Sequence, residues 1–299
     1  MIHDPGPVPY DPAGPHPDPG RPGPPAWLTE RLRSGGCVFP EDEADLIWSA
    51  ADGGCQPGDR GARTAMAWAM VERRVTGEPL ELVVGWAEVG GVRVPTEAGV
   101  FVPRRRSDLL VSVARDHLPG APGMVGPASD GMRPPVVVDL GCGTGALGLA
   151  VVADRPGVEL YAVDVDPAAV RLARSNLAGR GTVHLGDGLA GLPHRLRGRV
   201  DLVVANLPYV PSGQLHLLPA EARWHEPDAA LDGGPDGLDH LRRTVASVAV
   251  WLRPGGRLLM EVAPSQAAAA TAEAQAAGGT AGTVTDPDLD VAVLIVRPR

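Results

Sequence analysis

Residues 136–148 constrain the fold of this chain more than any other stretch, and they read Val-Val-Val-Asp-Leu-Gly-Cys-Gly-Thr-Gly-Ala-Leu-Gly. The three valines and Leu140 predict a short strand that is buried on both faces, as in a parallel sheet. Glycines at 141, 143 and 145 then allow a tight turn and let backbone N–H groups approach a ligand closely. A helix beginning there would point its positive end at the same place. The stretch therefore predicts a ligand-binding loop at the edge of a parallel sheet.

The residues after this loop alternate between strand-like and helix-like segments. Strands are expected at 136–140, 158–164, 183–185, 200–205, 257–262, 282–285 and 291–296. Helices are expected from the glycine loop to about 153 and at 167–176, 238–252 and 265–277, with a long loop at 211–235. This alternation predicts a doubly wound, mostly parallel α/β sheet of seven strands with right-handed crossovers. Its ligands should bind at the carboxyl ends of the strands.

The first part of the chain has a different character. Ten prolines among the first 25 residues predict a disordered tail. Helical patterns follow at 27–33, 41–51 and 62–76, then a β-hairpin at 82–102, an apolar helix at 109–118 and a Gly/Pro-rich linker at 119–135. We therefore divide the chain into a tail (1–25), a helical domain (26–81), a hairpin, helix and linker region (82–133) and a cofactor-binding domain (134–299).

Charge and cysteine content narrow the class of protein. A formal net charge of −9 argues against broad neutralisation of nucleic-acid phosphates and favours small molecules or protein partners. Cys37, Cys55 and Cys142 have no close metal-ligand spacing and leave no complete disulfide framework, which predicts a reducing compartment and no metal site. No run approaches the ~20 apolar residues of a membrane span. We expect a cytoplasmic protein that acts as a monomer.

Charged side chains fall where the predicted strands end. Asp164 ends the second strand, nineteen positions after Gly145, where a carboxylate can accept hydrogen bonds from ribose hydroxyls. Asp187 follows the third strand and is placed to meet an adenine amino group, although a plain turn residue fits there equally. Arg104 belongs to a run of three arginines that is either a solvated helix start or a carboxylate-binding group beside the cleft.

The glycine loop alone leaves the cofactor open. Gly143, Gly145 and Gly148 also satisfy the G-x-G-x-x-G pattern of dinucleotide sites, so a nicotinamide-dependent oxidoreductase is one alternative. Asp139, however, precedes the first glycine by two residues. A carboxylate there would meet the positive methionine end of S-adenosylmethionine but repel a pyrophosphate. We therefore favour S-adenosylmethionine.

The tetrapeptide Asn206-Leu207-Pro208-Tyr209 follows the fourth strand on the same edge. The side-chain carbonyl of Asn206 and the backbone carbonyl of Leu207 can both accept hydrogen bonds from one planar NH2 group. Such a clamp orients the nitrogen for in-line attack on a methyl group and stabilises the positive charge that develops. Tyr209 can pack on the flat substrate group. A plain turn at Pro208 is the bland alternative.

Several further pieces, in a specific order, accompany these motifs. They are Gly77-Glu78-Pro79-Leu80, Gly85-Trp86, Phe101-Val102-Pro103-Arg104, the Asp139 loop, Ala162-Val163-Asp164, Asn206-Leu207-Pro208-Tyr209, Glu226-Pro227, and Ala230-Leu231 with Gly233-Gly234 and Asp236-Gly237-Leu238. Over residues 27–297 the chain resembles the HemK/PrmC family of class I methyltransferases, which methylate the glutamine amide of a Gly-Gly-Gln motif in peptide chain release factors.

The resemblance implies a Rossmann-like class I fold with a small N-terminal helical domain that recognises the protein substrate. It implies that Asn206 and the Leu207 carbonyl hold the glutamine amide. It also implies an S-adenosylmethionine site lined by Asp139, Gly141, Asp164 and Asp187. From the residues themselves we add Gly143 and Gly145 of the loop, with Asn206 and Arg104 beside the site.

This sequence departs from the family pattern twice. Leu207 replaces the first proline of Asn-Pro-Pro-Tyr, and Pro103-Arg104-Arg105-Arg106-Ser107-Asp108 replaces Pro-Arg-Pro-Glu-Thr-Glu. Two alternatives remain besides the oxidoreductase. One is an adenine N6-methyltransferase acting on RNA or DNA, since the same clamp suits an adenine amino group; the other is an inactive module that binds the cofactor without transfer.

Overall fold

The computed structural model describes residues 23–118 and 133–299. The predictions of a disordered tail and of a linker concern residues that lie almost entirely outside these ranges. Among the described residues, no helix has the length and apolar character needed to cross a membrane.

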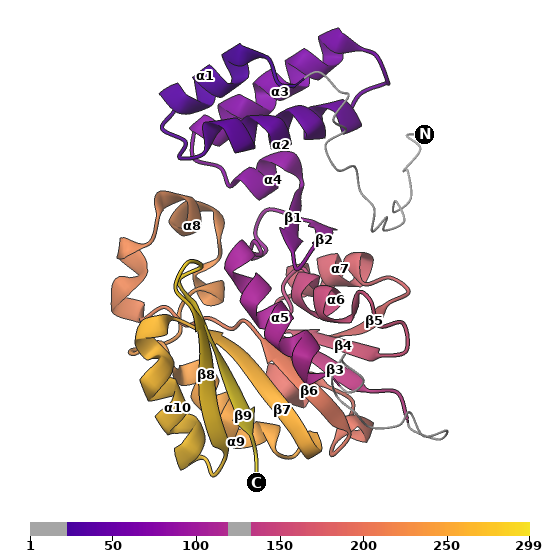
Figure 1. The fold of residues 1–299 in the computed structure, drawn as a ribbon, viewed down its shortest axis with the longest axis vertical. Helices are drawn as coiled ribbons and strands as arrows, with labels where there is room; N and C mark the ends of the chain where they lie inside the picture. Colours follow the sequence, from indigo (N-terminus) through magenta and orange to yellow (C-terminus); the bar gives the residue numbers. More distant parts are fainter. Residues whose placement is uncertain (1–22, 119–132) are drawn as a thin grey trace.

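Within the described ranges, a sheet of seven strands forms the centre of the larger domain, in the order β5-β4-β3-β6-β7-β9-β8 (Figure 1). Its strands are β3 (Val136–Leu140), β4 (Glu159–Asp164), β5 (Gly181–Leu185), β6 (Val200–Ala205), β7 (Leu252–Val262), β8 (Thr280–Asp286) and β9 (Val291–Arg297). β3 to β7 pair in parallel, whereas β9 runs antiparallel to both β7 and β8. The predicted doubly wound, mostly parallel sheet is confirmed. Its order reverses between β3 and β6, which is where such sheets bind ligands.

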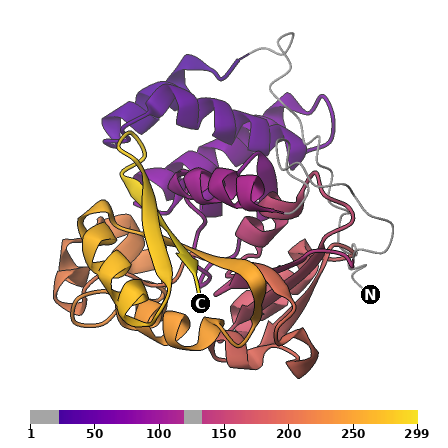
Figure 2. The same ribbon diagram turned by 60° about the horizontal axis from the view of Figure 1, so that its bottom comes forward.

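Helices cover both faces of the sheet, because alternate residues of each strand point to opposite sides. Val137 belongs to the core under α5 (Asp108–His117), α6 (Ala146–Val152) and α7 (Pro167–Asn176). Val136 and Val138 belong to the core under α9 (Asp239–Val248) and α10 (Ala267–Ala276). Figure 2 shows α5 and α10 on opposite sides of the sheet.

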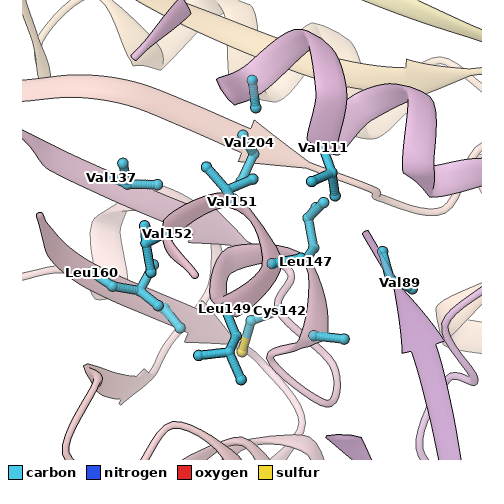
Figure 3. Packing of buried hydrophobic residues seen from close by; sticks show 14 of the residues in the cluster. Val89, Val111, Val137, Cys142, Leu147, Leu149, Val151, Val152, Leu160 and Val204 are labelled. Carbon is cyan, nitrogen blue, oxygen red and sulfur yellow. The ribbon is translucent and has the colours of Figure 1, made fainter. Parts of the chain in front are cut away.

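The first of these cores is densely filled by branched side chains. In Figure 3, Val151 and Val152 of α6 lie among Val137, Leu160 and Val204 of three neighbouring strands. Fully burying one such side chain stabilises a fold by about 1.5–3 kcal/mol. The packing holds β3, β4 and β6 at fixed distances from α6, and so fixes the loops at their carboxyl ends.

A separate helical unit lies above the sheet (Figure 1). It contains α1 (Ala26–Ser34), α2 (Pro40–Gly53), α3 (Arg60–Val75) and α4 (Leu80–Val84), packed around an apolar cluster of their own. The three predicted helices are confirmed, with small differences at their ends. α4 was not predicted: the expected hairpin included 82–84, which is wrong. Pro79 precedes this short helix and Gly85 ends it at φ +86°, and burial of Val83 in the helical cluster outweighs the strand preference of its valines.

The predicted β-hairpin is confirmed over a shorter length. β1 (Trp86–Val89) and β2 (Val92–Pro95) pair antiparallel across Gly90-Gly91, whose φ angles of +56° and +78° suit a tight hairpin turn. The Gly90 N–H donates to Asp108 Oδ1 (2.7 Å) at the start of α5. The Arg115 guanidinium donates to the carbonyls of Gly90 (3.2 Å) and Ala150 (2.7 Å). These bonds join the hairpin to α5 and α6.

The long loop predicted at 211–235 contains three short helical segments, so that prediction is wrong in part. They are η4 (Ser212–Leu217), α8 (Ala220–His225) and η5 (Asp228–Ala230). Each begins directly after a proline, at 211, 219 and 227, whose φ lies between −50° and −65°. The segment covers part of the carboxyl edge of the sheet.

Candidate active site

Two adjoining cavities lie at the carboxyl ends of the parallel strands. The larger, of about 720 Å³ and here called the large cavity, is lined by loops after β3, β4, β5 and β6 and by one side of α9. The smaller, of about 390 Å³ and here called the small cavity, lies between residues 206–210 and the segment around α8. Asn206, Leu207 and Pro208 line both cavities. The predicted clamp therefore stands where the two spaces meet.

The structure brings most of the predicted site residues together. The large cavity is lined by Asp139, Gly141, Gly143, Asp164, Asp187, Asn206, Leu207 and Pro208. Tyr209 and Arg104 line the small cavity. Gly145 occupies the N-cap position of α6 with φ +80°, where it ends the loop.

The glycine loop takes a shape that side chains would oppose. Gly141 and Gly143 have φ of +68° and +53°, and a Cβ on Gly141 would collide with the side chain of Leu207. The Gly141 N–H donates to the Val163 carbonyl (2.9 Å), and the Gly143 N–H donates to Asp164 Oδ2 (2.8 Å). The loop is thus tied to β4 while it packs against residue 207.

Asp139 is completely buried and only half satisfied. Its Oδ2 accepts a hydrogen bond from the Gly148 N–H (2.8 Å), whereas Oδ1 has no hydrogen-bond partner among the described residues. Burial raises the pKa of Asp139 to about 7; the Gly148 bond opposes the shift and the Asp164 charge adds to it. An unpaired, buried carboxylate oxygen in a cavity lining fits a cationic ligand group, such as the ammonium of a methionine moiety.

Gly148 completes the G-x-G-x-x-G pattern for a reason other than dinucleotide binding. A Cβ there would lie 2.8 Å from the Asp139 Cβ and 2.9 Å from its Oδ2. The third glycine of the pattern therefore allows the carboxylate to reach the first turn of α6.

Asp164 organises the neighbouring loop. Its two carboxylate oxygens accept hydrogen bonds from the N–H groups of Gly143 (2.8 Å) and Asp166 (2.9 Å). Each oxygen keeps a second lone pair for a ligand hydroxyl. Asp187, at the start of η2 (Gly188–Gly191), belongs to the same lining, as do Arg243 and Ser247 of α9. The α9 residues were not predicted, because the face that a helix turns to a cavity depends on tertiary packing.

Asn206 is held by a buried polar network. Its Nδ2 donates to Ser107 Oγ (3.2 Å), and Ser107 Oγ donates to Glu261 Oε2 (2.7 Å). The Tyr209 hydroxyl donates to the other oxygen of Glu261 (3.2 Å). Burial raises the pKa of Glu261, against the opposing effects of Ser107, Arg106 and Tyr209.

Sequence reasoning missed Ser107 and Glu261. A signal was present, since Glu261 is a charged residue within the apolar run of β7 and is only 1% exposed. A carboxylate in such a strand requires hydrogen-bonding partners.

Arg104, which we expected beside the cofactor, lines the small cavity and not the large one. Its guanidinium forms ion pairs with Glu221 (3.3 Å), Glu226 and, at 3.9 Å, Glu81. The physical reason is α8, the unpredicted helix, which brings Glu221 and Glu226 to the small cavity.

The backbone of Tyr209 is fixed by the segment at 231–238. Gln266 Nε2 donates to the carbonyls of Tyr209 (2.8 Å) and Asp236 (3.1 Å). A Cβ on Gly237, which has φ +79°, would collide with the Tyr209 carbonyl. The glycines of this segment thus let it pack directly on the clamp.

Comparison with known proteins finds methyltransferases among the relatives of this chain. The Methyltransferase small domain model matches residues 129–231. Release factor glutamine methyltransferase from Deinococcus radiodurans is 39% identical over 238 residues, 79% of each chain. The enzyme of that name from Streptomyces coelicolor is 34% identical over 247 residues, 81% of this chain and 84% of the relative. A 4-amino-L-phenylalanine/4-methylamino-L-phenylalanine methyltransferase from Streptomyces pristinaespiralis is 34% identical over 258 residues, 84% of this chain and 85% of the relative.

Among solved structures, the hMettl16 catalytic domain in complex with a MAT2A 3′UTR hairpin is similar in fold. It has a TM-score of 0.50 at 11% identity and covers 79% of this chain and 81% of that one. Its resemblance concerns the fold alone, whereas the sequence relatives share most of their length with this chain at 34–39% identity. The chain therefore belongs to the family of release factor glutamine methyltransferases.

Proposed function

We propose that this protein transfers a methyl group from S-adenosylmethionine to the side-chain amide nitrogen of a glutamine in a peptide chain release factor, within its Gly-Gly-Gln motif. The observation that carries the proposal is the position of Asn206 and Leu207, which line both cavities at once. A group held there faces the cofactor space on one side and the substrate space on the other.

The large cavity is the proposed cofactor site. Asp139 would hold the amino group of the methionine moiety, Asp164 the ribose hydroxyls and Asp187 the adenine. Gly141 and Gly143 would let the backbone approach. The cofactor supplies an electrophilic methyl group.

The clamp supplies orientation and charge stabilisation. An amide nitrogen is a poor nucleophile because its lone pair is delocalised. Asn206 Oδ1 and the Leu207 carbonyl would each accept a hydrogen bond from one N–H of the substrate amide. These two bonds would orient the nitrogen and stabilise the positive charge that develops on it as it attacks the methyl group. The Tyr209 ring, held through its hydroxyl by Glu261, would pack on the planar amide.

Exposed apolar residues on the segment around α8 and beside the start of α2 support a protein substrate. Leu217 and Trp224 are 70% and 76% exposed on the segment that carries α8, and Phe39, next to the start of α2, is 66% exposed. Arg74 joins these elements, since it pairs with Glu43 of α2 (2.7 Å) and Glu221 of α8 (3.0 Å). We assign substrate recognition to the helical domain at 26–81. We propose that the whole protein acts as a monomer in the cytoplasm.

A small aromatic amine is a second candidate substrate. The relative from Streptomyces pristinaespiralis is named for 4-amino-L-phenylalanine, and the two acceptors of the clamp would serve an aryl NH2 equally well. Arg106, whose guanidinium carbon lies 5.8 Å from the centroid of the Tyr209 ring, could pair with the carboxylate of such a substrate.

The test is transfer of labelled methyl from S-adenosylmethionine to purified release factor, with the modified residue located by tandem mass spectrometry. A release factor whose Gly-Gly-Gln glutamine is replaced by alanine is the control, and 4-amino-L-phenylalanine and RNA are tested in parallel. Asn206→Ala should abolish transfer while cofactor affinity, measured by calorimetry, stays nearly unchanged. An undiminished rate in this variant would refute the clamp. Labelling of RNA alone would favour an adenine enzyme, and cofactor binding without transfer to any substrate would favour an inactive module.

A further inference from the structure

A buried chain of three side chains connects the clamp to β7. Asn206 Nδ2 lies 3.2 Å from Ser107 Oγ, which lies 2.7 Å from Glu261 Oε2. We infer that Ser107 and Glu261 are positioning residues which hold the Asn206 amide with its carbonyl oxygen toward the substrate nitrogen. This inference rests on the proposed function and deepens it, because it names what decides which end of the amide the substrate meets.

An asparagine needs such a device, because its oxygen and its NH2 group are nearly equal in size. With the oxygen facing the substrate, the side chain accepts a hydrogen bond from the substrate NH2. With the amide turned over, two NH2 groups would face each other and the clamp would repel its substrate. Shape alone discriminates poorly between these states, so a directional hydrogen bond must do so.

The direction of the network follows from the number of protons available. An ionised carboxylate can only accept, so the single hydroxyl proton of Ser107 is donated to Glu261. The Ser107 oxygen is then left with lone pairs alone, and it accepts from Asn206 Nδ2. A turned amide would place its own oxygen against those lone pairs and lose the bond.

The neighbours of Glu261 favour its charged form, in opposition to burial, which raises its pKa. It is 1% exposed, and it receives hydrogen bonds from Ser107 and from the Tyr209 hydroxyl (3.2 Å). The Arg106 guanidinium adds an ion pair, with Nε 3.5 Å from Oε1. One carboxylate thus holds both the first and the last residue of the clamp.

The sheet explains why this carboxylate can reach the clamp. Ala205 of β6 pairs with Met260 of β7 in parallel register. Asn206 directly follows the end of β6 and Glu261 follows Met260 on β7, so the strand pairing brings them side by side. Ser107, at the end of the single turn η1 (Arg105–Ser107) before α5, fills the space between them.

The test compares Ser107→Ala with Ser107→Thr, which keeps the hydroxyl. Loss of a hydrogen bond in a charged network should lower kcat roughly 10- to 100-fold in Ser107→Ala, with S-adenosylmethionine affinity unchanged, and Ser107→Thr should recover most of the rate. Thr271→Ala is the control, because it also removes a hydroxyl that donates a hydrogen bond, to the Ala267 carbonyl (2.8 Å), but within α10 and outside this network. Full activity of Ser107→Ala would overturn the inference.

A second comparison separates positioning from a general effect on structure. Added to Asn206→Asp, which keeps acceptor oxygens but has no NH2 group for Ser107 to hold, the change Ser107→Ala should reduce the rate no further, because its action runs through the Asn206 amide. An equal reduction in both backgrounds would overturn the inference.

A third measurement needs no methyl transfer at all. In the nitrogen-15-labelled wild-type protein, the NMR signal of the Asn206 side-chain NH2 is identified because it is missing from Asn206→Ala. Its hydrogens should exchange slowly with solvent in the wild-type protein and faster in Ser107→Ala. Slow exchange in both proteins would contradict the network. If wild-type protein transfers no methyl to release factor but shows this difference, the proposed substrate fails and the positioning role survives.

Discussion

Asp139 places an ionisable group near the end of a buried strand and beside a cavity, and one of its oxygens has no hydrogen-bond partner in the described part of the chain. Burial favours the neutral form, whereas a positive ligand group favours the charged form. Protonation of Asp139 and binding of a positively charged ligand group should therefore oppose each other. Because its pKa in the folded protein, about 7, exceeds the ordinary value of 3.8, folding of the ligand-free protein should become less favourable as pH rises between these values.

Cofactor binding should show the opposite pH dependence. Below about pH 7, binding of the cationic cofactor must release the Asp139 proton, so cofactor affinity should fall about tenfold for each unit by which the pH is lowered. Above about pH 8 the affinity should no longer change with pH. Calorimetric titration of S-adenosylmethionine over this range checks the slope. Asp139→Asn should bind more weakly and lose the pH dependence. A wild-type affinity that is constant with pH would contradict the predicted role.

Asp164 should affect the same affinity through hydrogen bonds that its carboxylate accepts from the neutral ribose hydroxyls. Asp164→Ala removes acceptors for the ribose and for the Gly143 N–H, and should weaken cofactor binding by about 1–3 kcal/mol. Asp164→Asn, which keeps one acceptor oxygen, should lose less. Asp59→Ala, which removes an N-cap from α3, is a control for helix stability away from the cavity. Equal affinity in Asp164→Ala and wild type would place the ribose elsewhere.

At the scale of elements, the clamp is a strand end supported by the segment at 231–238. Gly237→Ala should disturb it, because the new Cβ would collide with the Tyr209 carbonyl. Gly278→Ala is the matched control: it also has positive φ, +90°, but its Cβ would meet no atom within 4 Å in the described part of the chain. Both changes should cost about 1–2 kcal/mol of backbone strain. Only Gly237→Ala should also lower kcat for methyl transfer, and equal kcat in the two variants would argue against support from this segment.

The strands could be predicted because parallel strands are buried on both faces and appear as short apolar runs. The predicted ranges 136–140 and 200–205 coincide with β3 and β6. α8 could not be predicted in this way, since its sequence Ala-Glu-Ala-Arg-Trp-His has no buried residue and it is held by ion pairs between Glu221 and two distant arginines.

The same distinction applies to the candidate site. Asp139, Asp164, Asp187 and Asn206 each lie at or just beyond the carboxyl end of a strand, so sheet topology alone predicts that they meet. Ser107 and Glu261 are separated by 154 positions and are joined by a contact that only the folded chain contains. The residues proposed to touch the cofactor and substrate were therefore predictable, but those that orient them were not.

At the scale of the whole molecule, a chain of ion pairs connects the helical domain to the small cavity. Arg74 of α3 contacts Glu43 and Glu221, and Glu221 also contacts Arg104, which pairs with Glu226. The Arg74 side chain is 15% exposed, and its partners raise its pKa, so it stays charged. A partly buried network of this kind fixes relative position more firmly than isolated surface pairs do. The helical domain and the wall of the small cavity should therefore respond together to substrate.

Arg74→Ala tests this connection, because it leaves Glu43 and Glu221 facing each other without their shared cation. The variant should raise KM for release factor several-fold and speed hydrogen exchange in α8, while S-adenosylmethionine affinity at the large cavity stays unchanged. Arg33→Ala is the control in the same domain: it breaks an exposed pair with Glu41, and such pairs are worth about 0–1 kcal/mol. Steady-state kinetics with both substrates, together with exchange mass spectrometry, distinguishes the two variants. If Arg74→Ala changed cofactor affinity and KM alike, the ion pairs would be stabilising the whole fold rather than linking the helical domain to the substrate side.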